Sequence, residues 1–418
     1  MQSAASLTEL FGGTTNRGPS NPHPVYRRLR RESPVLPVIS LTGGASYLLT
    51  RYEDVRDTLR NDAVFSNRAN ERVVGAVFGR TIIEMDGREH LRHRNIVTPA
   101  LAPRALKGGF AERVASIAHE LIDGFAADGR VDLVSGFTFT FPLRVFTQIL
   151  GLPVQDYDTF RRWSMDLTGI ADDPPAAFAA SRTLADYLRP IVEKRRAEPR
   201  ADLISRLACA EVEGENLSDE EVISFLRLLV SAGAETTYHL IGSALYALLT
   251  HPAAMEELRA DRSLLQATID ETLRWECPVA ITNRELVAPA QVGGVEIPAG
   301  AGVVLAIASA NRDEEQFEEP DRFDIHRSPN DHVAFGFGKH YCAGSRLAYL
   351  EAQVALGTLL DRLPGLRLDP DASCGITGFA FRGPDRLPVL FERASRRALA
   401  QHDHAAVDDD GLAGHEVR

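Results

Sequence analysis

The longest helix that the sequence predicts constrains the fold more than any other feature. Ser218 and Glu221 form a capping box, and an apolar run continues from Val222 to Thr250. The predicted helix has about 32 residues, which corresponds to about 48 Å of length. A helix this long must cross the whole molecule, so the rest of the chain has to pack around it.

The middle of this helix carries residues that a purely structural helix avoids. Residues 232–237 read Ala-Gly-Ala-Glu-Thr-Thr. Gly233 weakens the helix by about 1 kcal/mol relative to alanine, and Glu235 is unfavourable in an apolar centre unless it has a partner or a task. One interpretation is a buried helix whose glycine eases packing and whose Glu235 reaches a salt bridge. The other is a local opening, where Glu235 and Thr236 lie beside a bound ligand and relay protons.

A cysteine lies in a glycine-rich loop. Residues 335–344 read Phe-Gly-Phe-Gly-Lys-His-Tyr-Cys-Ala-Gly, and an amphipathic helix is predicted to follow as far as about Leu363. Cys342 falls just before the N-terminus of that helix, where the helix dipole and free N–H groups favour a thiolate. A lone cysteine is usually an inert core residue. Three glycines and a histidine around it favour instead a metal-bound thiolate, shielded by Phe335 or Phe337.

Composition narrows the classes of protein that remain. The 418 residues include 46 Lys and Arg against 58 Asp and Glu, and this net charge of −12 argues against general nucleic-acid binding. The four scattered cysteines form no C-x-x-C pair, which excludes a zinc ribbon or a disulfide scaffold and favours a reducing compartment. No apolar stretch approaches the roughly 20 residues that span a membrane, and the N-terminus lacks signal-peptide features. We therefore expect a cytoplasmic protein.

The remaining patterns predict a mainly helical α+β chain with small sheets. Residues 99–265 are mostly helical, whereas residues 35–52, 281–308 and 375–391 are rich in strands. Length alone would allow two or three domains, but no change of composition divides the chain. We expect a flexible N-terminus over 1–21, one domain over 22–393 and a disordered tail over 394–418.

Together these motifs resemble the cytochrome P-450 superfamily of haem-thiolate monooxygenases, in particular its soluble bacterial members. Residues 335–344 match the haem-binding signature F-G-x-G-x-x-x-C-x-G, and residues 232–237 resemble the oxygen-binding segment A-G-x-[DE]-T-T. Glu271 and Arg274 match the E-x-x-R pair, and residues 311–324 resemble the meander that precedes the haem loop. The resemblance implies a single-domain fold with a helical haem-binding core.

The resemblance also implies roles for individual residues. Cys342 would be the axial thiolate of haem b, a ligand that favours cleavage of the O–O bond. Glu235 and Thr236 match the family's acid–alcohol pair, which delivers protons to dioxygen. The propionates would be bound by His90, Arg94, Arg284 and His340; the other expected cofactor contacts are Gly233, Phe335, Gly336 and Gly344. Glu271 and Arg274 would have a structural role.

The sequence says less about the substrate and the redox partner than about the cofactor. The expected pocket is apolar and suits a hydrophobic small molecule such as a terpenoid, steroid, polyketide or fatty acid; its candidates are Val77, Phe78, Ile82, Ala232, Val279, Ile281 and Phe379. No dinucleotide loop or cysteine cluster is present, so electrons from NAD(P)H would arrive through a ferredoxin or flavodoxin and its reductase. Residues 80–107 (net charge +3), with Lys339 and Arg346, form a candidate docking patch, although these arginines can instead serve the propionates.

The expected function is therefore insertion of one oxygen atom from O2 into a hydrophobic molecule, by hydroxylation or epoxidation. A peroxide-driven haem-thiolate oxidase is an alternative, but such enzymes can dispense with the acid–alcohol pair that Glu235 and Thr236 supply here. A non-catalytic haem protein is a second alternative, and it would have no need for Thr236.

Overall fold

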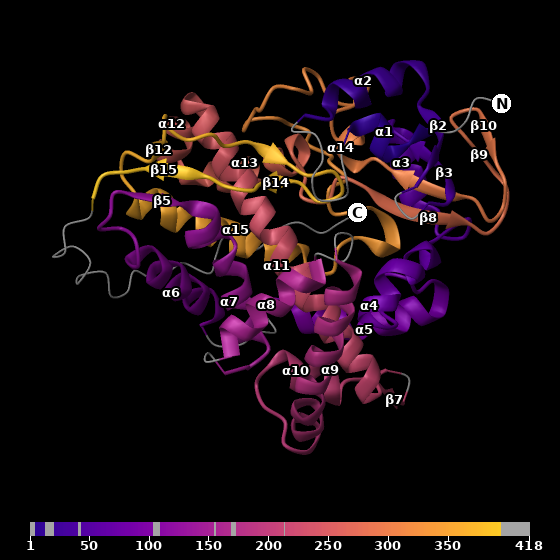
Figure 1. Ribbon diagram of the computed structural model, residues 1–418, viewed down its shortest axis with the longest axis horizontal. Coiled ribbons are helices and arrows are strands. Elements are labelled where there is room, and N and C mark those ends of the chain that lie inside the picture. Colours follow the sequence, from indigo (N-terminus) through magenta and orange to yellow (C-terminus); the bar gives the residue numbers. More distant parts are fainter. Residues whose placement is uncertain are drawn as a thin grey trace.

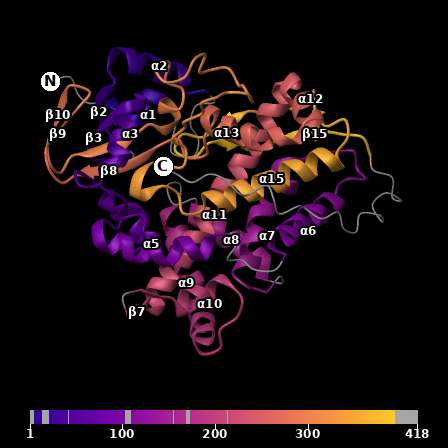
Figure 2. The ribbon, with the colours of Figure 1, turned by 180° about the vertical axis from the view of Figure 1, so that it is seen from behind.

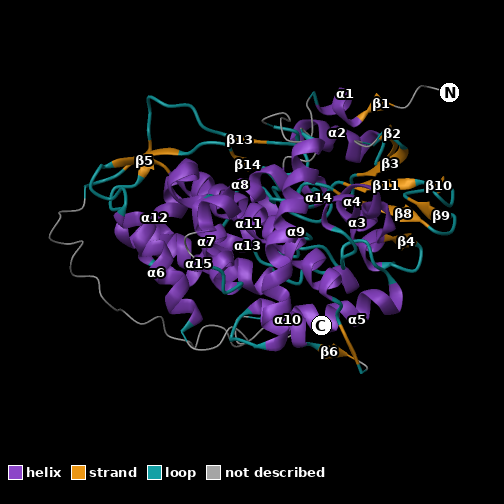
Figure 3. Cartoon of the chain, turned by 60° about the horizontal axis from the view of Figure 1, so that its bottom comes forward, coloured by secondary structure: helices purple, strands orange, loops and turns teal. Residues whose placement is uncertain are grey.

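Helices fill the middle of the molecule, and strands gather toward two of its ends (Figure 3). The computed structural model describes residues 5–12, 21–40, 43–102, 109–153, 156–168, 173–212 and 214–393, so the expected tail lies outside the described residues. The helices are α1 (Leu7–Phe11), α2 (His23–Glu32), α3 (Tyr52–Arg60), α4 (Ala76–Phe78), α5 (Gly87–Leu101), α6 (Phe110–Asp123), α7 (Thr140–Ile149), α8 (Tyr157–Thr168), α9 (Pro174–Ala197), α10 (Leu203–Cys209), α11 (Asp219–Thr250), α12 (Pro252–Ala260), α13 (Leu265–Trp275), α14 (Ile307–Ala310) and α15 (Ser345–Arg362). This mainly helical architecture confirms the expected fold class.

The strands form small sheets. They are β1 (Ala5–Ser6), β2 (Val35–Ile39), β3 (Ala45–Leu49), β4 (Phe65–Ser66), β5 (Arg130–Asp132), β6 (Glu211–Val212), β7 (Glu215–Asn216), β8 (Thr282–Leu286), β9 (Ala290–Val292), β10 (Val295–Ile297), β11 (Gly302–Leu305), β12 (Arg367–Leu368), β13 (Ile376–Thr377), β14 (Gly383–Pro384) and β15 (Pro388–Leu390). The largest sheet has the order β1-β2-β3-β11-β8-β4 and lies beside α2 and α3 (Figure 1). Within it Arg284 of β8 pairs with Val303 of β11 in antiparallel register, which fixes the position of this arginine.

Helix α11 is the predicted long helix, and it runs through the centre of the fold beside α15 (Figure 2). The Ser218 hydroxyl accepts a hydrogen bond from the Glu221 N–H at 3.2 Å, and the Glu221 carboxylate accepts one from the Ser218 N–H at 2.7 Å. The local opening that one interpretation placed near residue 235 does not interrupt the helix, which is continuous over α11. The Thr236 hydroxyl donates back to the Ala232 carbonyl at 2.8 Å. Among helices in the described ranges, none is long and apolar enough to cross a membrane.

The N-terminal segment differs from the expectation of a flexible stretch over 1–21. Within it, Ala5 and Ser6 pair with β2 in parallel, and Leu7 and Phe11 of α1 are buried. The Phe11 ring lies 4.9 Å from the ring of Phe379, measured between centroids. These described residues belong to the core. Leu7 and Phe11 are one helical turn apart, so they lie on the same face of α1, and that face packs against the rest of the protein.

The Glu271–Arg274 pair fixes the meander. Both side chains are fully buried, and Arg274 donates to the two Glu271 carboxylate oxygens at 2.7 and 2.8 Å. Arg274 also donates to the carbonyls of Asn311, Pro320 and Arg322, and Glu271 accepts from the N–H of Asp324. Each charge therefore has an opposite charge and backbone partners, which offsets the penalty of burying the pair. The expected structural role agrees with this geometry.

Candidate active site

The loop before α15 holds the thiol of Cys342 close to backbone N–H groups. Gly336 and Gly338 adopt φ values of 76° and 72°, which favour glycine, and the Cys342 N–H donates to the Phe335 carbonyl at 2.8 Å. Burial raises the pKa of the Cys342 thiol, whereas N–H groups of Gly344 and Ser345 that donate to the sulfur act in the opposite direction. The side chain nevertheless retains accessible surface. The sulfur is thus surrounded by protein but free to accept a ligand.

The two phenylalanines of the loop have different environments. Phe335 is partly buried, and its ring lies 5.3 Å from the Tyr349 ring and 6.0 Å from the Tyr341 ring, between centroids. Phe337 is 40% exposed. Between the two residues that the sequence left open as a shield for the thiol, the packing favours Phe335.

Four cationic or imidazole side chains converge near this loop, and within the described ranges only His340 of these four lies within 4 Å of a carboxylate, that of Asp86. His90 of α5 stacks on His340, with ring centroids 3.8 Å apart, and both buried Nε2 atoms lack a hydrogen-bond partner among the described residues. Arg284 is 5% exposed, and burial lowers its pKa to about 10. Arg94 donates to the Tyr341 carbonyl, and in the described part of the chain no carboxylate lies within ion-pair distance of Arg94 or Arg284. Buried donors without an anion indicate a site for an anionic group.

Asp86 organises this group of donors, and the sequence prediction missed it. Its carboxylate accepts from the Ser66 hydroxyl at 2.5 Å and from the Asn67 N–H at 3.2 Å, and it lies 3.7 Å from the His340 Nε2 atom. Burial would raise the pKa of Asp86, but the neighbouring His340 imidazole and hydrogen bonds from Ser66 and Asn67 outweigh burial and hold the pKa below its usual range. The only available signal was its place directly before α5, four residues ahead of His90.

These residues fit the haem that the sequence predicts. A thiol that receives N–H donors and keeps accessible surface suits an axial thiolate. Two unpartnered imidazole nitrogens and two arginines without carboxylates suit a pair of propionates. The donor set and the orphaned nitrogen atoms thus agree with the expected roles of Cys342, His90, Arg94, Arg284 and His340.

Glu235 and Thr236 occupy the face of α11 that has accessible surface at mid-helix. Ala232 is exposed although most of α11 is buried, and Glu235 and Thr236 are partly exposed. No ion-pair partner of Glu235 is found among the described residues, which argues against the salt-bridge interpretation. Burial raises the pKa of Glu235 to about 8. The side chain is therefore mostly protonated at neutral pH and can act as a proton donor.

Gly233 has a packing reason that the sequence did not reveal. A Cβ atom at this position would lie 3.0 Å from the ring of Phe146 on α7, so a side chain here would require that ring to shift by a few tenths of an ångström. The expected approach of Gly233 to the haem stays a prediction. The cost of a helical glycine is offset by close contact between α7 and α11.

The expected pocket residues divide into two groups. Val77, Phe78, Ile281 and Phe379 are buried in the apolar cores, whereas Ile82, Val279 and Ala232 keep accessible surface. Phe379 packs on Phe11, which accounts for its apolar character without a ligand. Ile82, Val279 and Ala232 are the candidates with accessible surface, and contact of all seven residues with a substrate stays a prediction.

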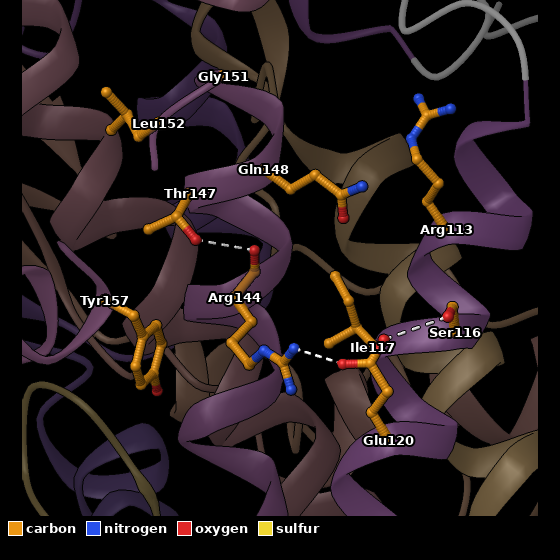
Figure 4. A pocket seen from close by; sticks show the side chains of 10 residues that line it. All are labelled: Arg113, Ser116, Ile117, Glu120, Arg144, Thr147, Gln148, Gly151, Leu152 and Tyr157. Atoms are coloured by element: carbon orange, nitrogen blue, oxygen red, sulfur yellow. Dashed lines mark hydrogen bonds and ion pairs between the residues drawn. The ribbon is translucent and has the colours of Figure 1, made fainter. Parts of the chain in front are cut away.

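A groove of about 500 Å³ lies elsewhere, between α6 and α7 (Figure 4). Arg144 crosses it and pairs with Glu120 at 2.6 Å, and Ile117, Leu152 and Tyr157 contribute its apolar wall. No predicted site residue lines this groove.

Much of the candidate docking patch is neutralised. Arg80 pairs with Glu89 at 2.6 Å, and Lys339 pairs with Asp62 at 2.9 Å. Arg104 and Lys107 lie outside the described residues, whereas Arg346 is exposed beside the cysteine loop. The net charge of +3 for residues 80–107 already includes Glu89, so among the described ion pairs it is those of Lys339 with Asp62 and of Arg92 with Glu215 that lower the positive charge below the sequence count.

Comparison with known proteins agrees with this geometry. The family model described as Cytochrome P-450 matches residues 175–364. The chain is 38% identical over 397 residues to the Vitamin D(3) 25-hydroxylase of Pseudonocardia autotrophica, covering 91% of this chain and 96% of that protein. It is 35% identical over 384 residues to the Cytochrome P-450 monooxygenase PikC of Streptomyces venezuelae, covering 90% and 92%.

Solved structures show the same fold. The crystal structure of CYP109E1 from Bacillus megaterium in complex with testosterone is 32% identical, with a TM-score of 0.81 over 89% of this chain and 99% of that chain. The likeness thus extends over nearly the whole length of each relative. With the haem-loop cysteine, the acid–alcohol pair and the E-x-x-R pair all in place, the chain belongs to the cytochrome P-450 family.

Proposed function

We propose that this haem monooxygenase hydroxylates or epoxidises a hydrophobic small molecule of steroid, terpenoid or other secondary-metabolite type. Two similarities support the class of substrate. One relative is named a Vitamin D(3) 25-hydroxylase, and a structural neighbour was solved with testosterone. The apolar side chains Ile82 and Val279 that keep accessible surface suit such a molecule.

We assign the cofactor contacts as follows. Cys342 binds the iron, and His90, Arg94, Arg284 and His340 bind the propionates. When bound, haem supplies activation of dioxygen and transfer of one oxygen atom to the substrate. The N–H groups of Gly344 and Ser345 favour the anionic form of the sulfur, and Phe335 limits the access of water to it.

Proton supply is assigned to the pair on α11. Glu235, with a pKa of about 8, holds a proton on a carboxyl oxygen at neutral pH. The Thr236 hydroxyl gives its own hydrogen to the Ala232 carbonyl at 2.8 Å, so lone pairs on Oγ1 remain to accept from water. A water held by Thr236 can then take a proton from Glu235 and pass it to the reacting oxygen. The place of the Glu235 carboxyl, beside Thr236 at the accessible middle of α11 and without an ion-pair partner among the described residues, is the observation that most strongly supports the proposal.

Electrons are assigned to an external ferredoxin or flavodoxin with its reductase. The exposed side chains beside the cysteine loop and on α5 include Arg346, Phe337 and Leu91, which offer charge and apolar area to a partner. We also propose a cytoplasmic location, because four free cysteines suit a reducing compartment.

The proposed function is tested with the purified holoenzyme, NAD(P)H, a ferredoxin and its reductase. Steroids, vitamin D3 and terpenoids are screened for substrate-induced shifts of the haem spectrum and for products that carry one added oxygen atom. Binding and oxygenation of at least one of these is expected. Turnover with hydrogen peroxide but none with NAD(P)H and dioxygen would identify a peroxide-driven oxidase. Absence of any shift across the panel would reject the substrate class.

A further inference from the structure

Four polar side chains join helices α13 and α15 next to the cysteine loop, residues 335–344. On α13 the Gln266 amide donates to the Asp270 carboxylate at 3.2 Å, one helical turn away. On α15 the Tyr349 hydroxyl donates to the same carboxylate at 2.5 Å, and the Gln353 amide donates to the Gln266 side-chain oxygen at 2.9 Å. These four residues therefore form one hydrogen-bonded network that links the two helices.

Asp270 is the centre of this network. Its carboxylate also lies 3.8 Å from the Nε2 atom of His332, which comes three residues before Phe335. Burial would raise the pKa of Asp270, but the His332 imidazole and the hydrogen-bond donors on α13 and α15 outweigh burial and hold the pKa below its usual value. Asp270 is thus a partly buried, ionised carboxylate, which makes it a strong acceptor for these donors.

Two of the side chains that surround the Phe335 ring are in contact with this carboxylate. The Phe335 ring lies 5.3 Å from the Tyr349 ring and 6.2 Å from the His332 ring, measured between centroids. Tyr341 supplies a further ring at 6.0 Å. Tilted contacts of this kind orient aromatic side chains relative to one another. The orientation of the Phe335 ring therefore depends on two neighbours that Asp270 holds in place.

Phe335 connects this arrangement to the sulfur of Cys342. The Phe335 carbonyl accepts the Cys342 N–H at 2.8 Å, so a displacement of residue 335 also moves the backbone of the cysteine. Apolar groups around a metal ligand control the access of water and the local dielectric, and both change the reduction potential of the metal. Residues that fix the Phe335 ring therefore act on the reduction potential of the haem that Cys342 is proposed to bind.

We propose that Asp270 is a positioning residue that fixes the Phe335 ring through its two aromatic neighbours, and so keeps the reduction potential of the haem low. Without its bond to Asp270 the Tyr349 ring is free to move, the Phe335 ring turns, and water reaches the sulfur. Water that donates hydrogen bonds to a thiolate withdraws electron density from it, so the iron becomes easier to reduce. The proposal rests on the proposed ligation of iron by Cys342.

The test measures the reduction potential of the holoenzyme by spectroelectrochemical titration. Tyr349→Phe removes only the hydroxyl and leaves the charge of Asp270 in place. Tyr187→Phe is the matched control, because the Tyr187 hydroxyl donates to Asp156 at 2.6 Å while its ring packs on Phe160 of α8. In Tyr349→Phe the ratio of reduced to oxidised enzyme at a fixed potential should rise about tenfold, a shift of about +59 mV for one electron. The control should keep the wild-type potential.

A second variant separates position from charge. Asp270→Asn should shift the potential in the same direction as Tyr349→Phe, with faster amide hydrogen exchange in peptides covering residues 332–341 and unchanged exchange in peptides from α9. A shift in Asp270→Asn with none in Tyr349→Phe would show that charge alone acts, and it would overturn the proposal. Exchange that rises equally throughout the chain would overturn it as well, because the potential would then report general destabilisation.

The reduced carbon monoxide adduct separates this proposal from the assignment on which it rests. A wild-type spectrum without the thiolate-type Soret band would reject ligation by Cys342, and with it the role of Asp270. A thiolate-type band in the wild type, together with equal potentials in Tyr349→Phe and Tyr187→Phe, would overturn the role of Asp270 and leave the ligation standing.

Discussion

The protonation of Glu235 should limit the pH range in which electron use and product formation stay coupled. Burial raises the pKa of Glu235 from 4.5 to about 8. The acid is then about nine-tenths protonated at pH 7 and about one-tenth protonated at pH 9, because each pH unit changes the ratio tenfold. Coupling, measured as product formed per NAD(P)H consumed, should fall with a midpoint near the pKa of about 8.

The raised pKa of Glu235 also makes the free energy of unfolding depend on pH. Above pH 4.5 the unfolded chain releases the proton of Glu235, whereas the folded chain keeps it up to about pH 8. The free energy of unfolding therefore decreases as the pH rises through this window, by at most about 5 kcal/mol. Because the side chain is partly exposed, solvent screening reduces this to about 2–3 kcal/mol. Glu235→Gln removes the loss, so it should raise the unfolding free energy at pH 8 more than at pH 5.

The assay compares wild type, Glu235→Gln and Glu256→Gln, an exposed carboxylate on α12. Coupling in Glu235→Gln should be low and independent of pH from about pH 6 to about pH 9, whereas Glu256→Gln should follow wild type. Denaturant unfolding at the two pH values supplies the stability difference. The reasoning is refuted if Glu235→Gln shows the wild-type pH profile of coupling, or if its stability gain is equal at pH 5 and pH 8.

Three further changes probe other parts of the site. Thr236→Ala should uncouple NAD(P)H consumption from product formation while substrate binding stays unchanged; unchanged coupling would place the proton supply elsewhere. Arg274→Leu removes the closest cation from the buried Glu271 carboxylate, which among the described residues keeps only Arg327 as a cation, at 3.2 Å, and it also removes the donor to three backbone carbonyls. Denaturant unfolding should show a loss of about 3–5 kcal/mol, with poor haem incorporation. Gly338→Ala forces alanine into a left-handed backbone conformation and places its Cβ atom 3.2 Å from the Leu59 carbonyl oxygen. The unfolding free energy should fall by about 1–2 kcal/mol or more. An unchanged value would contradict the loop geometry.

Local patterns were sufficient to predict the elements that carry the chemistry. The capping box at Ser218 and the apolar run after it predicted α11 with its bounds, because both signals lie within one segment. The glycines around Cys342 predicted a loop that leads into a helix, and Gly336 and Gly338 do adopt positive φ. Glu271 and Arg274, three residues apart on one helix, could be paired for the same reason.

Features that depend on distant segments could not be predicted in this way. The close contact at Gly233 is made by Phe146, which lies nearly 90 residues earlier in the chain. The contact of the Phe379 ring with Phe11, 4.9 Å between centroids, joins segments more than 360 residues apart. Lys339 was counted as free positive charge, but Asp62 neutralises it. In each case the contacting residue is distant in the sequence, so the local sequence pattern carries no signal of the contact.

Ligation of iron by Cys342 is the central claim, and the spectrum of the reduced carbon monoxide adduct tests it most directly. The wild-type protein should show the strongly red-shifted Soret band of a thiolate-bound haem, because the thiolate donates electron density to the iron. Cys342→Ser should lose that band while it still binds haem through the propionate contacts. A histidine-type spectrum in the wild type, or a red-shifted band that persists in Cys342→Ser, would contradict the account.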